Sequence, residues 1–248
     1  MEFERRRLLG AIAATAASGA AAACGSSPPR PTTTARSAAV TPGARAPYFS
    51  GEIVHGPRGR RQIALTFHGA GDPAVARRVL AATAAAGAQI TVLAVGTWLD
   101  AQPEMARLIL AGGHELGNHT QNHPDINAMS PLAARAEIAQ CAERLRNLTG
   151  TIGSWFRPSR TPHANAIVRA QATEAGYHAC LSYDVDSLDF SDPGPDAVVR
   201  NVLHGAQGGS IVSMHLGHPG TATAMPPLLE GLRRRGLRAV TVSTLLSP

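Results

Sequence analysis

Short apolar runs alternate with amphipathic stretches along most of the chain. The runs predict buried strands at 63–67, 90–95, 178–183, 211–215 and 239–242. The stretches between them predict helices at 72–87, 103–113, 130–148 and 164–175, and one more that ends at 236. Such alternation of strands and helices predicts an α/β fold, with a parallel sheet or barrel and the helices outside it.

The predicted helix boundaries agree with capping chemistry. Asp72 precedes Pro73 and Ser130 precedes Pro131, and this order is typical of an N-cap followed by proline in the first helical turn. Glycines follow the predicted helices, as expected for helix ends. The boundaries are therefore predicted independently of the apolar pattern.

The first 46 residues do not share this pattern. Residues 1–24 predict an export signal, because three arginines precede a short alanine-rich apolar run that ends in small residues before Cys24. This ending resembles a bacterial lipobox, in which the cysteine is lipidated, and the arginines weakly resemble a twin-arginine signal. Ordinary secretion with cleavage nearby is the alternative. Residues 25–46 predict a Pro/Ser/Thr/Ala tether, and 47–248 the folded domain.

Composition narrows the class of protein. The chain has 248 residues, of which 44% are hydrophobic and 16% charged, and this excludes a mostly disordered chain, a coiled coil and a polytopic membrane protein. The net charge is +6, and all 23 basic residues are arginines. Because most of the arginines are scattered and only 4% of residues are aromatic, we expect no nucleic-acid partner. Cys141 and Cys180 could pair after export, but two buried free thiols are the commoner arrangement.

Polar residues that can take part in catalysis follow several predicted strands directly. They are His68 and Asp72 after 63–67, His119 and His123 after the segment 114–117, Arg157 after 154–156, Asp186 and Asp189 after 178–183, and His215 at the end of 211–215. In barrel enzymes the carboxyl ends of the strands carry the chemistry. We therefore expect these side chains to gather in one site.

Taken in order, four segments resemble motifs of the polysaccharide deacetylase family, also called the NodB-homology domain or carbohydrate esterase family 4. They are HTQNH at 119–123, FRP at 156–158, DSLDF at 186–190 and GSIVSMH at 209–215. The resemblance covers about residues 60–248. It implies a distorted (β/α) barrel and a hydrolase that removes N-acetyl or O-acetyl groups from sugars with a divalent metal.

The first family motif, TFDDGP, reads TFHGAG at 66–71. In the family the first aspartate is the general base and the second is a metal ligand, so this chain has His68 and Gly69 at those two positions. Phe190 stands where tryptophan is usual, and Ser213 stands where leucine is usual. The departures concern the catalytic details and leave the predicted fold unchanged.

A metal site is predicted at His119 and His123. Their spacing of four places both imidazoles on one side of a helical turn, where they can share a cation. Catalytic zinc sites normally use three protein ligands, so a third is needed. His68 is the nearest replacement and Asp72 the next, although Asp72 also fits a helix N-cap. Zinc is the expected metal.

The role of His68 stays open between metal ligand and general base. A histidine that ligates a metal cannot also deprotonate the attacking water, whereas a free imidazole with a pKa of about 6.5 is a competent base near neutral pH. The vacancy at Gly69 favours the ligand role, because the longer imidazole at position 68 could reach the metal.

The remaining roles are those that the resemblance implies. His215 would be the general acid, Asp189 would orient it, and Arg157, lacking the usual catalytic aspartate, would pair with Asp186, Asp189 or the substrate. The backbone N–H of Arg160 would stabilise an oxyanion, Leu188 and Phe190 would line the acetyl pocket, and Glu115 and Asn118 would support the metal-binding turn.

Two functions from different classes follow. The first is a metal-dependent deacetylase acting on an acetylated cell-envelope or extracellular glycan. The second is a catalytically impaired homologue that binds glycan at the envelope. In either case we expect a monomer that is held to the outer face of the cytoplasmic membrane by lipid on Cys24, or secreted.

Overall fold

The computed structural model describes residues 51–248, which form the α/β fold that the sequence predicts. The predicted export signal at 1–24, its Cys24 and the tether at 25–46 lie outside the described residues, as does the predicted domain start at 47. Among residues 51–248 no helix has the length and apolar character needed to cross a membrane.

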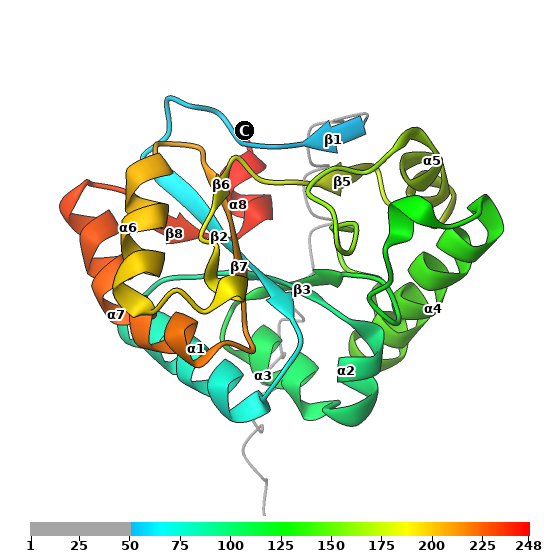
Figure 1. Ribbon diagram of the computed structural model, residues 1–248, viewed down its shortest axis with the longest axis horizontal. Coiled ribbons are helices and arrows are strands. Elements are labelled where there is room, and N and C mark those ends of the chain that lie inside the picture. The colour runs from blue at the N-terminus through cyan, green and yellow to red at the C-terminus, as the bar shows by residue number, and fades with distance from the viewer. Residues whose placement is uncertain (1–50) are drawn as a thin grey trace, which may run out of the picture. The chain divides into compact units, whose positions relative to one another are not determined.

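Parallel strands form the centre of the described region (Figure 1). They are β1 (Gly51–Ile53), β2 (Gln62–Gly69), β3 (Thr91–Ala94), β4 (Glu115–Asn118), β5 (Ala179–Leu181), β6 (Val185–Asp186), β7 (Ile211–His215) and β8 (Arg238–Val240). β2 is the middle strand, with β3 and then β4 on one side and β7 and then β6 on the other. β8 pairs with the first residues of β2, and β1 pairs with β5.

The series of strands curves into a distorted barrel. Phe156 bridges Asn118 of β4 and Cys180 of β5, so the parallel order continues from β4 to β5. β5 and β6 then stand at the two ends of the series, although only residues 182–184 separate them in the chain. The two ends must therefore lie near each other. This arrangement confirms the predicted α/β class.

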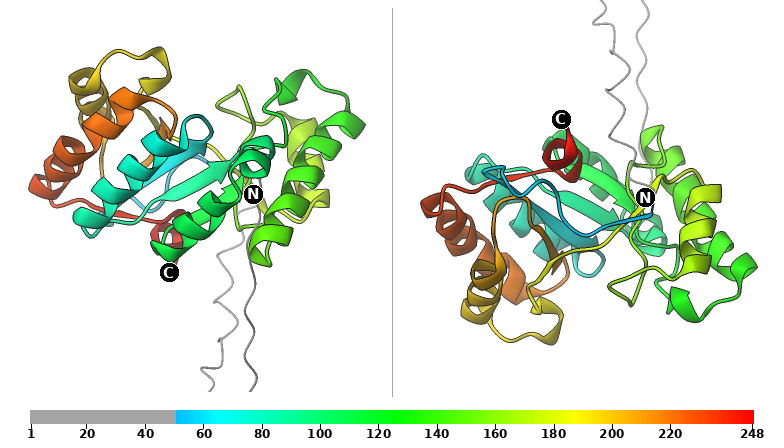
Figure 2. Two further views of the ribbon diagram at one scale, coloured as in Figure 1. Left: turned by 90° about the horizontal axis from the view of Figure 1, so that it is seen from below. Right: turned by 90° about the horizontal axis from the view of Figure 1, so that it is seen from above.

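Helices surround the strands. They are α1 (Pro73–Ala85), α2 (Gly96–Ala101), α3 (Glu104–Ala111), α4 (Pro131–Thr149), α5 (Ala166–Glu174), α6 (Pro195–Gly205), α7 (Pro219–Arg234) and α8 (Val242–Leu246). α1, α6 and α7 pack together beside one end of the strand series, and α4 and α5 pack beside the other (Figures 1 and 2). The Asp72 side chain accepts from the N–H of Ala74, and that of Ser130 accepts from the N–H of Ala133, so both predicted N-caps are confirmed.

Side chains alternate between the two faces of β2, so that one face packs into the apolar core and the other faces the site. Ile63, Leu65 and Phe67 join the large apolar cluster that also contains side chains of α1, α3 and α7, whereas Ala64 belongs to a different cluster inside the barrel. His68 is four residues after Ala64 on the same strand, so its side chain faces the same inner side. A Cβ on Gly69 would meet Val92 and Ala94, which belong to the large cluster, so residues 68 and 69 face opposite sides of the strand.

Several elements differ from the sequence predictions. The predicted strand at 239–242 is wrong at its end, because β8 stops at Val240 and α8 begins at Val242. The helices α2, α6 and α8 and the short strands β1 and β6 were not predicted. Each of these strands has two or three residues, and α2 and α8 have six and five, so these four are too short to display a period. α6 has eleven residues and was missed for another reason.

Gly69→Ala is expected to lower the free energy of unfolding by about 1–3 kcal/mol, the usual cost of overpacking. The reason is that a Cβ at residue 69 would lie 2.8 Å from Cγ1 of Val92 and 3.0 Å from Cα of Ala94. Urea denaturation measures the change. Gly59→Ala is the matched control, since nothing lies within 4 Å of a Cβ there. Equal stability of Gly69→Ala and the wild type would show that β2 and β3 separate at this point without cost.

Candidate active site

Most of the polar residues singled out in the sequence meet at the carboxyl ends of the strands. The His68 ring, at the end of β2, has its centroid 4.3 Å from that of His119 and 4.3 Å from that of His215. The rings of His119 and His123 are 4.9 Å apart. Four histidines from three parts of the chain therefore form one continuous cluster, as the strand-end argument predicted.

Three of these histidines form a group with the spacing of metal ligands. His68, His119 and His123 each offer a ring nitrogen, and these nitrogens lie within 4.8 Å of one another. The Nδ1 atom of His119 lies 3.0 Å from the carbonyl oxygen of Arg157, so that nitrogen carries the proton. The Nε2 atom of His119 is buried and has no hydrogen-bond partner. A buried lone pair without a partner is costly unless something binds it, so the residues present fit a metal ion.

The electrostatics of this group favour neutral imidazoles. Burial is the main cause that lowers the pKa of His68 and of His119 well below the usual value, and neighbouring imidazoles add to it. Burial likewise lowers the pKa of His123, with a contribution from the charge of Arg160. Neutral imidazole is the form that binds a metal, so the group is in the competent state at neutral pH.

The predicted helical turn at 119–123 is wrong. These residues form a loop after β4, in which Thr120 and His123 have left-handed backbone angles, with φ of 68° and 58°. Asn118 holds the loop, because its Oδ1 accepts from the N–H of Thr120 at 2.8 Å. Glu137 of α4 supports it from the other side, accepting from the backbone N–H and the side-chain amide of Asn122 at 2.8 and 2.7 Å. The rings of His119 and His123 are therefore brought together by the conformation of this loop, and not by a spacing of four residues on a helix.

Two residues predicted near the metal, Glu115 as a support of the turn and Asp72 as the alternative third ligand, lie elsewhere. The Glu115 side chain accepts from Trp155 Nε1 at 2.9 Å and from Thr91 Oγ1 at 2.9 Å, at the start of β4, so it does not support the metal-binding loop. Asp72 is exposed and caps α1, and the three-histidine group does not include it. The N-cap interpretation of Asp72 is therefore confirmed, and the structure does not bring it together with the proposed ligands.

A buried aspartate orients the fourth histidine of the cluster. Asp189 Oδ1 lies 2.7 Å from His215 Nδ1, and its Oδ2 accepts from the backbone N–H of His215 at 2.8 Å and from Thr221 Oγ1 at 2.6 Å. Burial raises the pKa of Asp189, but these hydrogen bonds outweigh it and hold the pKa below its usual value. The carboxylate therefore keeps the Nδ1 proton of His215 in place and leaves Nε2 for chemistry.

Arg157 is fully buried, but among the described residues it forms no ion pair with Asp186 or Asp189. Its Nε and Nη2 donate to the carbonyl oxygens of Leu181 and Ser182 at 3.2 and 3.0 Å, and its Nη1 has no partner. Burial lowers the pKa of Arg157 to about 10. The guanidinium lies 5.4 Å from the centroid of the Tyr183 ring, which supplies part of the missing stabilisation.

Two of the three predicted substrate-binding residues, Arg160 and Phe190, lie beside this cluster. Arg160 is exposed, with φ of 57°, and its charge acts on His123. Phe190 is 53% exposed, and its ring lies 5.9 Å from that of His215. Leu188 is 45% exposed. An exposed aromatic ring beside a polar site suits a carbohydrate, and the binding roles of Phe190 and Leu188 stay predictions.

Three further residues contact the cluster or the side chains around it but were not predicted to act there. Ser213 Oγ lies 3.4 Å from His68 Nε2, Tyr183 lies beneath Arg157, and Thr221 donates to Asp189. Ser213 had a signal in the sequence, since it stands where the family usually has leucine. Tyr183 and Thr221 had none, because only the folded chain brings them to the site.

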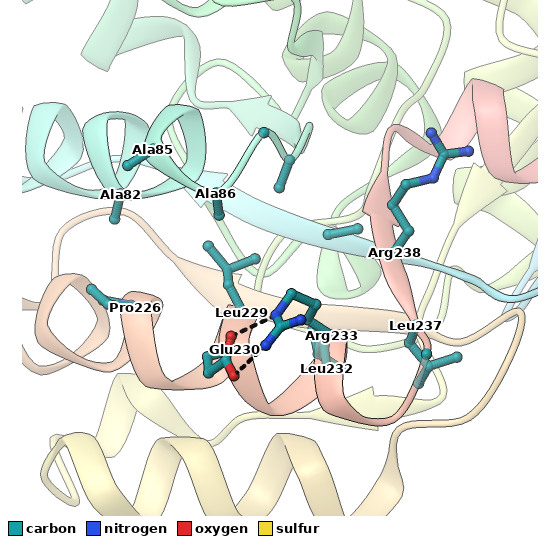
Figure 3. A pocket seen from close by; sticks show the side chains of 14 residues that line it. Ala82, Ala85, Ala86, Pro226, Leu229, Glu230, Leu232, Arg233, Leu237 and Arg238 are labelled. Atoms are coloured by element: carbon teal, nitrogen blue, oxygen red, sulfur yellow. Dashed lines mark hydrogen bonds and ion pairs between the residues drawn. The ribbon is translucent and has the colours of Figure 1, made fainter.

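A sizeable hollow lies away from the histidine cluster. A cavity of about 730 Å³ opens between α1, α7 and β8, and Figure 3 shows its alanine and leucine lining and the ion pair of Glu230 with Arg233. None of the predicted site residues lines this cavity. A second hollow, of about 660 Å³, is lined by Asp186 and Leu188 together with residues of α6. The chemistry therefore concentrates at the histidine cluster.

Comparisons of the sequence with known proteins all point to the same family. Residues 55–180 match the family model described as polysaccharide deacetylase. A peptidoglycan-N-acetylglucosamine deacetylase from Bacillus cereus is 32% identical over 194 residues, which cover 77% of this chain and 90% of the relative. A chitooligosaccharide deacetylase from a Bradyrhizobium species is 30% identical over 201 residues, covering 72% of this chain and 87% of the relative.

Solved structures are similar in fold. A CE4 family pseudoenzyme from Bacillus anthracis superimposes with a TM-score of 0.75 at 22% identity, covering 79% of this chain and 69% of that one. A T48 deacetylase with substrate superimposes with a TM-score of 0.68 at 27% identity, covering 75% and 91%. The predicted family and enzyme class are confirmed: this chain belongs to the polysaccharide deacetylase family.

Proposed function

We propose that this protein is a metal-dependent hydrolase that removes acetyl groups from an acetylated cell-envelope or extracellular polysaccharide. One observation carries the proposal. Three imidazole nitrogens within 4.8 Å of one another lie beside a fourth histidine that a buried carboxylate orients. A Lewis-acid site next to an oriented proton donor is the arrangement that hydrolysis of an amide or ester needs.

The donor set suits zinc. His68, His119 and His123 would hold the ion, because three nitrogen ligands with one open position are typical of catalytic zinc sites. The unpartnered Nε2 of His119 supports this choice. When bound, the ion would polarise the acetyl carbonyl and make the attacking water more acidic.

The chain's own residues would then handle the leaving group. With its Nδ1 proton held by Asp189, His215 can carry a second proton on Nε2 and deliver it to the departing amine or alkoxide. Phe190, beside the His215 ring, would shield this transfer from water, and the backbone N–H of Arg160 would face the developing oxyanion. The exposed side chains of Leu188 and Phe190 suit recognition of the sugar.

We assign His68 to the metal rather than to the general-base role. Two neutral histidines alone would hold a cation weakly, and Gly69 supplies no ligand. Asp72 is engaged in capping α1, so it is not available as a base beside the group. Turnover should therefore be slower than in family members with the aspartate pair, since a positioned base typically contributes about 10²–10⁴-fold.

A glycan-binding protein without turnover is the second candidate. The observation that favours it is the absence, within the described residues, of any carboxylate from the three-histidine group. Asp189 contacts His215 outside that group, and its oxygens are already occupied by His215 and Thr221. The Asp189–His215 pair favours the enzyme, because a binder has no need of an oriented proton donor.

For location, we propose that the protein is exported and lipid-anchored through Cys24 to the outer face of the cytoplasmic membrane, or else secreted. The supporting features are the arginines, the apolar run and the small residues before Cys24. The tether would hold the domain, as a monomer, away from the membrane and within reach of an acetylated envelope glycan.

Replacing both His119 and His123 with alanine is expected to abolish retention of zinc after dialysis, because one imidazole cannot hold the ion. Metal content per protein measures the effect. His204→Ala is the matched control, since His204 is exposed on α6 and lies outside the group. Undiminished zinc in the double variant would refute the site.

Cys24→Ser is expected to move the protein from the membrane fraction to the soluble exported fraction, because serine lacks the thiol to which the lipid would be attached. Fractionation of the producing cells and their medium measures the change. A wild-type protein found wholly in the medium would exclude the anchor and favour secretion.

His68→Ala is expected to lower both zinc affinity and turnover on an acetylated sugar oligomer, because the variant removes one of three ligands. Chelator competition and acetate release measure the two effects, with His204→Ala as the control. Loss of turnover with zinc affinity intact would make His68 the general base. No acetate release from peptidoglycan, chitin or xylan oligomers by the zinc-loaded wild type would favour the binding protein.

A further inference from the structure

A second aspartate–histidine pair lies beside the first. His218 Nδ1 is 2.8 Å from Asp192 Oδ1, just as His215 Nδ1 is 2.7 Å from Asp189 Oδ1. The centroids of the His215 and His218 rings are 5.7 Å apart, with the ring planes at 78°. Only the first pair takes part in the proton transfer proposed above, so the second pair has no role yet.

The local backbone brings the two pairs together in the same order. Asp189–Ser191 form a 3₁₀ turn, in which residues three apart lie one above the other, and Asp192 follows Asp189 by three. His218 likewise follows His215 by three, between the end of β7 and the start of α7. The first aspartate of one segment therefore meets the first histidine of the other, and the second meets the second.

The segment that carries His218 is held against the end of β2. The backbone N–H of Leu216 donates to the carbonyl oxygen of His68 at 3.1 Å. A Cβ on Gly217 would lie 2.9 Å from the carbonyl oxygen of Ala70, so the two loops touch through their backbones. The position of His218 beside the cluster is therefore fixed by the main chain on its N-terminal side.

The second pair differs from the first in its exposure. The side chains of His218 and Asp192 are 29% and 66% exposed, whereas that of Asp189 is fully buried. Exposed pairs of this kind contribute little to folding. Because a carboxylate accepts hydrogen bonds, the Nδ1 atom of His218 carries the proton. Its Nε2 forms no hydrogen bond within residues 51–248, and is thus available to a ligand.

We propose that His218, oriented by Asp192, is a substrate-binding residue whose Nε2 accepts a hydrogen bond from a free hydroxyl group of the glycan. The proposal rests on the proposed function and deepens it. His215 would give its proton to the atom that leaves the acetyl group, so the sugar must lie against the His215 ring. The neighbouring His218 ring is then beside the hydroxyl groups next to the reacting atom.

The same 3₁₀ turn supplies an apolar contact for the sugar. Phe190, in that turn, is 53% exposed, and its ring lies 5.9 Å from that of His215. Binding sites for small molecules combine apolar surface with a few polar groups that fix the orientation of the ligand. Phe190 would contact the ring of the sugar, and His218 would distinguish a hydroxylated substrate from a plain acetyl ester.

His218→Ala is expected to raise the KM for an N-acetylglucosamine oligomer about 3–10-fold, the usual effect of losing one hydrogen bond, with a smaller change in kcat. The rise in KM for phenyl acetate should be smaller, because that ester has no hydroxyl group. Acetate release measures both. An unchanged KM for the oligomer, or an equal rise for the two substrates, would overturn the proposal.

Two conservative variants separate binding of the glycan from a structural role of the pair. In His218→Asn the amide nitrogen can replace Nδ1 toward Asp192, but nothing remains at the place of Nε2. In His218→Gln the longer amide reaches that place. We expect His218→Asn to behave like His218→Ala and His218→Gln to recover part of the loss, with similar thermal unfolding of all three. A wild-type KM in His218→Asn would overturn the proposal.

Equilibrium binding distinguishes failure of this inference from failure of the proposed function. Titration calorimetry of the zinc-loaded protein with the same oligomer needs no turnover. Weaker binding by His218→Ala would support the inference, even if the wild type released no acetate and the deacetylase function were refuted. Equal binding by the variant and the wild type would overturn the inference, whether or not acetate is released. A wild type that neither binds nor hydrolyses chitin, peptidoglycan or xylan oligomers would refute both.

Discussion

The parallel register of β2 against β7 governs where the polar groups of this site lie. It sets His68 opposite His215, so that two rings from distant parts of the chain stand with their centroids 4.3 Å apart. The period of two along β2 then directs His68 inward, while Gly69 packs toward Val92 and Ala94. Because a side chain at 69 would crowd Val92 and Ala94 on the other side of the strand, the inward residue at 68 is the one available to the site.

Charge is the second constraint on the cluster. Arg157 is buried without an ion pair and relies on two carbonyl oxygens and the Tyr183 ring. A divalent ion nearby would add positive charge to a site whose three proposed ligands are all neutral. With no carboxylate to offset that charge, affinity depends on the number and orientation of nitrogen donors. This favours a metal that binds imidazole strongly, such as zinc, over one that requires oxygen.

The sequence predicted the long elements and the strand-end residues, and it could not predict the turns. β2, β3 and β7 have apolar runs, and α1 and α4 have N-caps, so periodicity and capping were sufficient for them. The loop at 119–123 was assigned to a helical turn because spacing of four is also helical spacing, whereas left-handed angles at Thr120 and His123 have no signature in those residue types. Tyr183 and Thr221 reach the site only through strand order, which depends on contacts distant in sequence.

The surroundings of His215 bear on whether this fold still carries out chemistry. Asp189 is buried and receives three hydrogen bonds, from the ring and backbone of His215 and from Thr221. Burying a carboxylate is costly, and a surface that only binds glycan gains nothing from it. The burial of Asp189 is explained if its carboxylate must fix the His215 imidazole in one tautomer, with Nε2 directed at a leaving group. His119 and His215 would then each have Nδ1 tied to the protein and Nε2 available, the arrangement of a site in which the direction of each lone pair and proton matters.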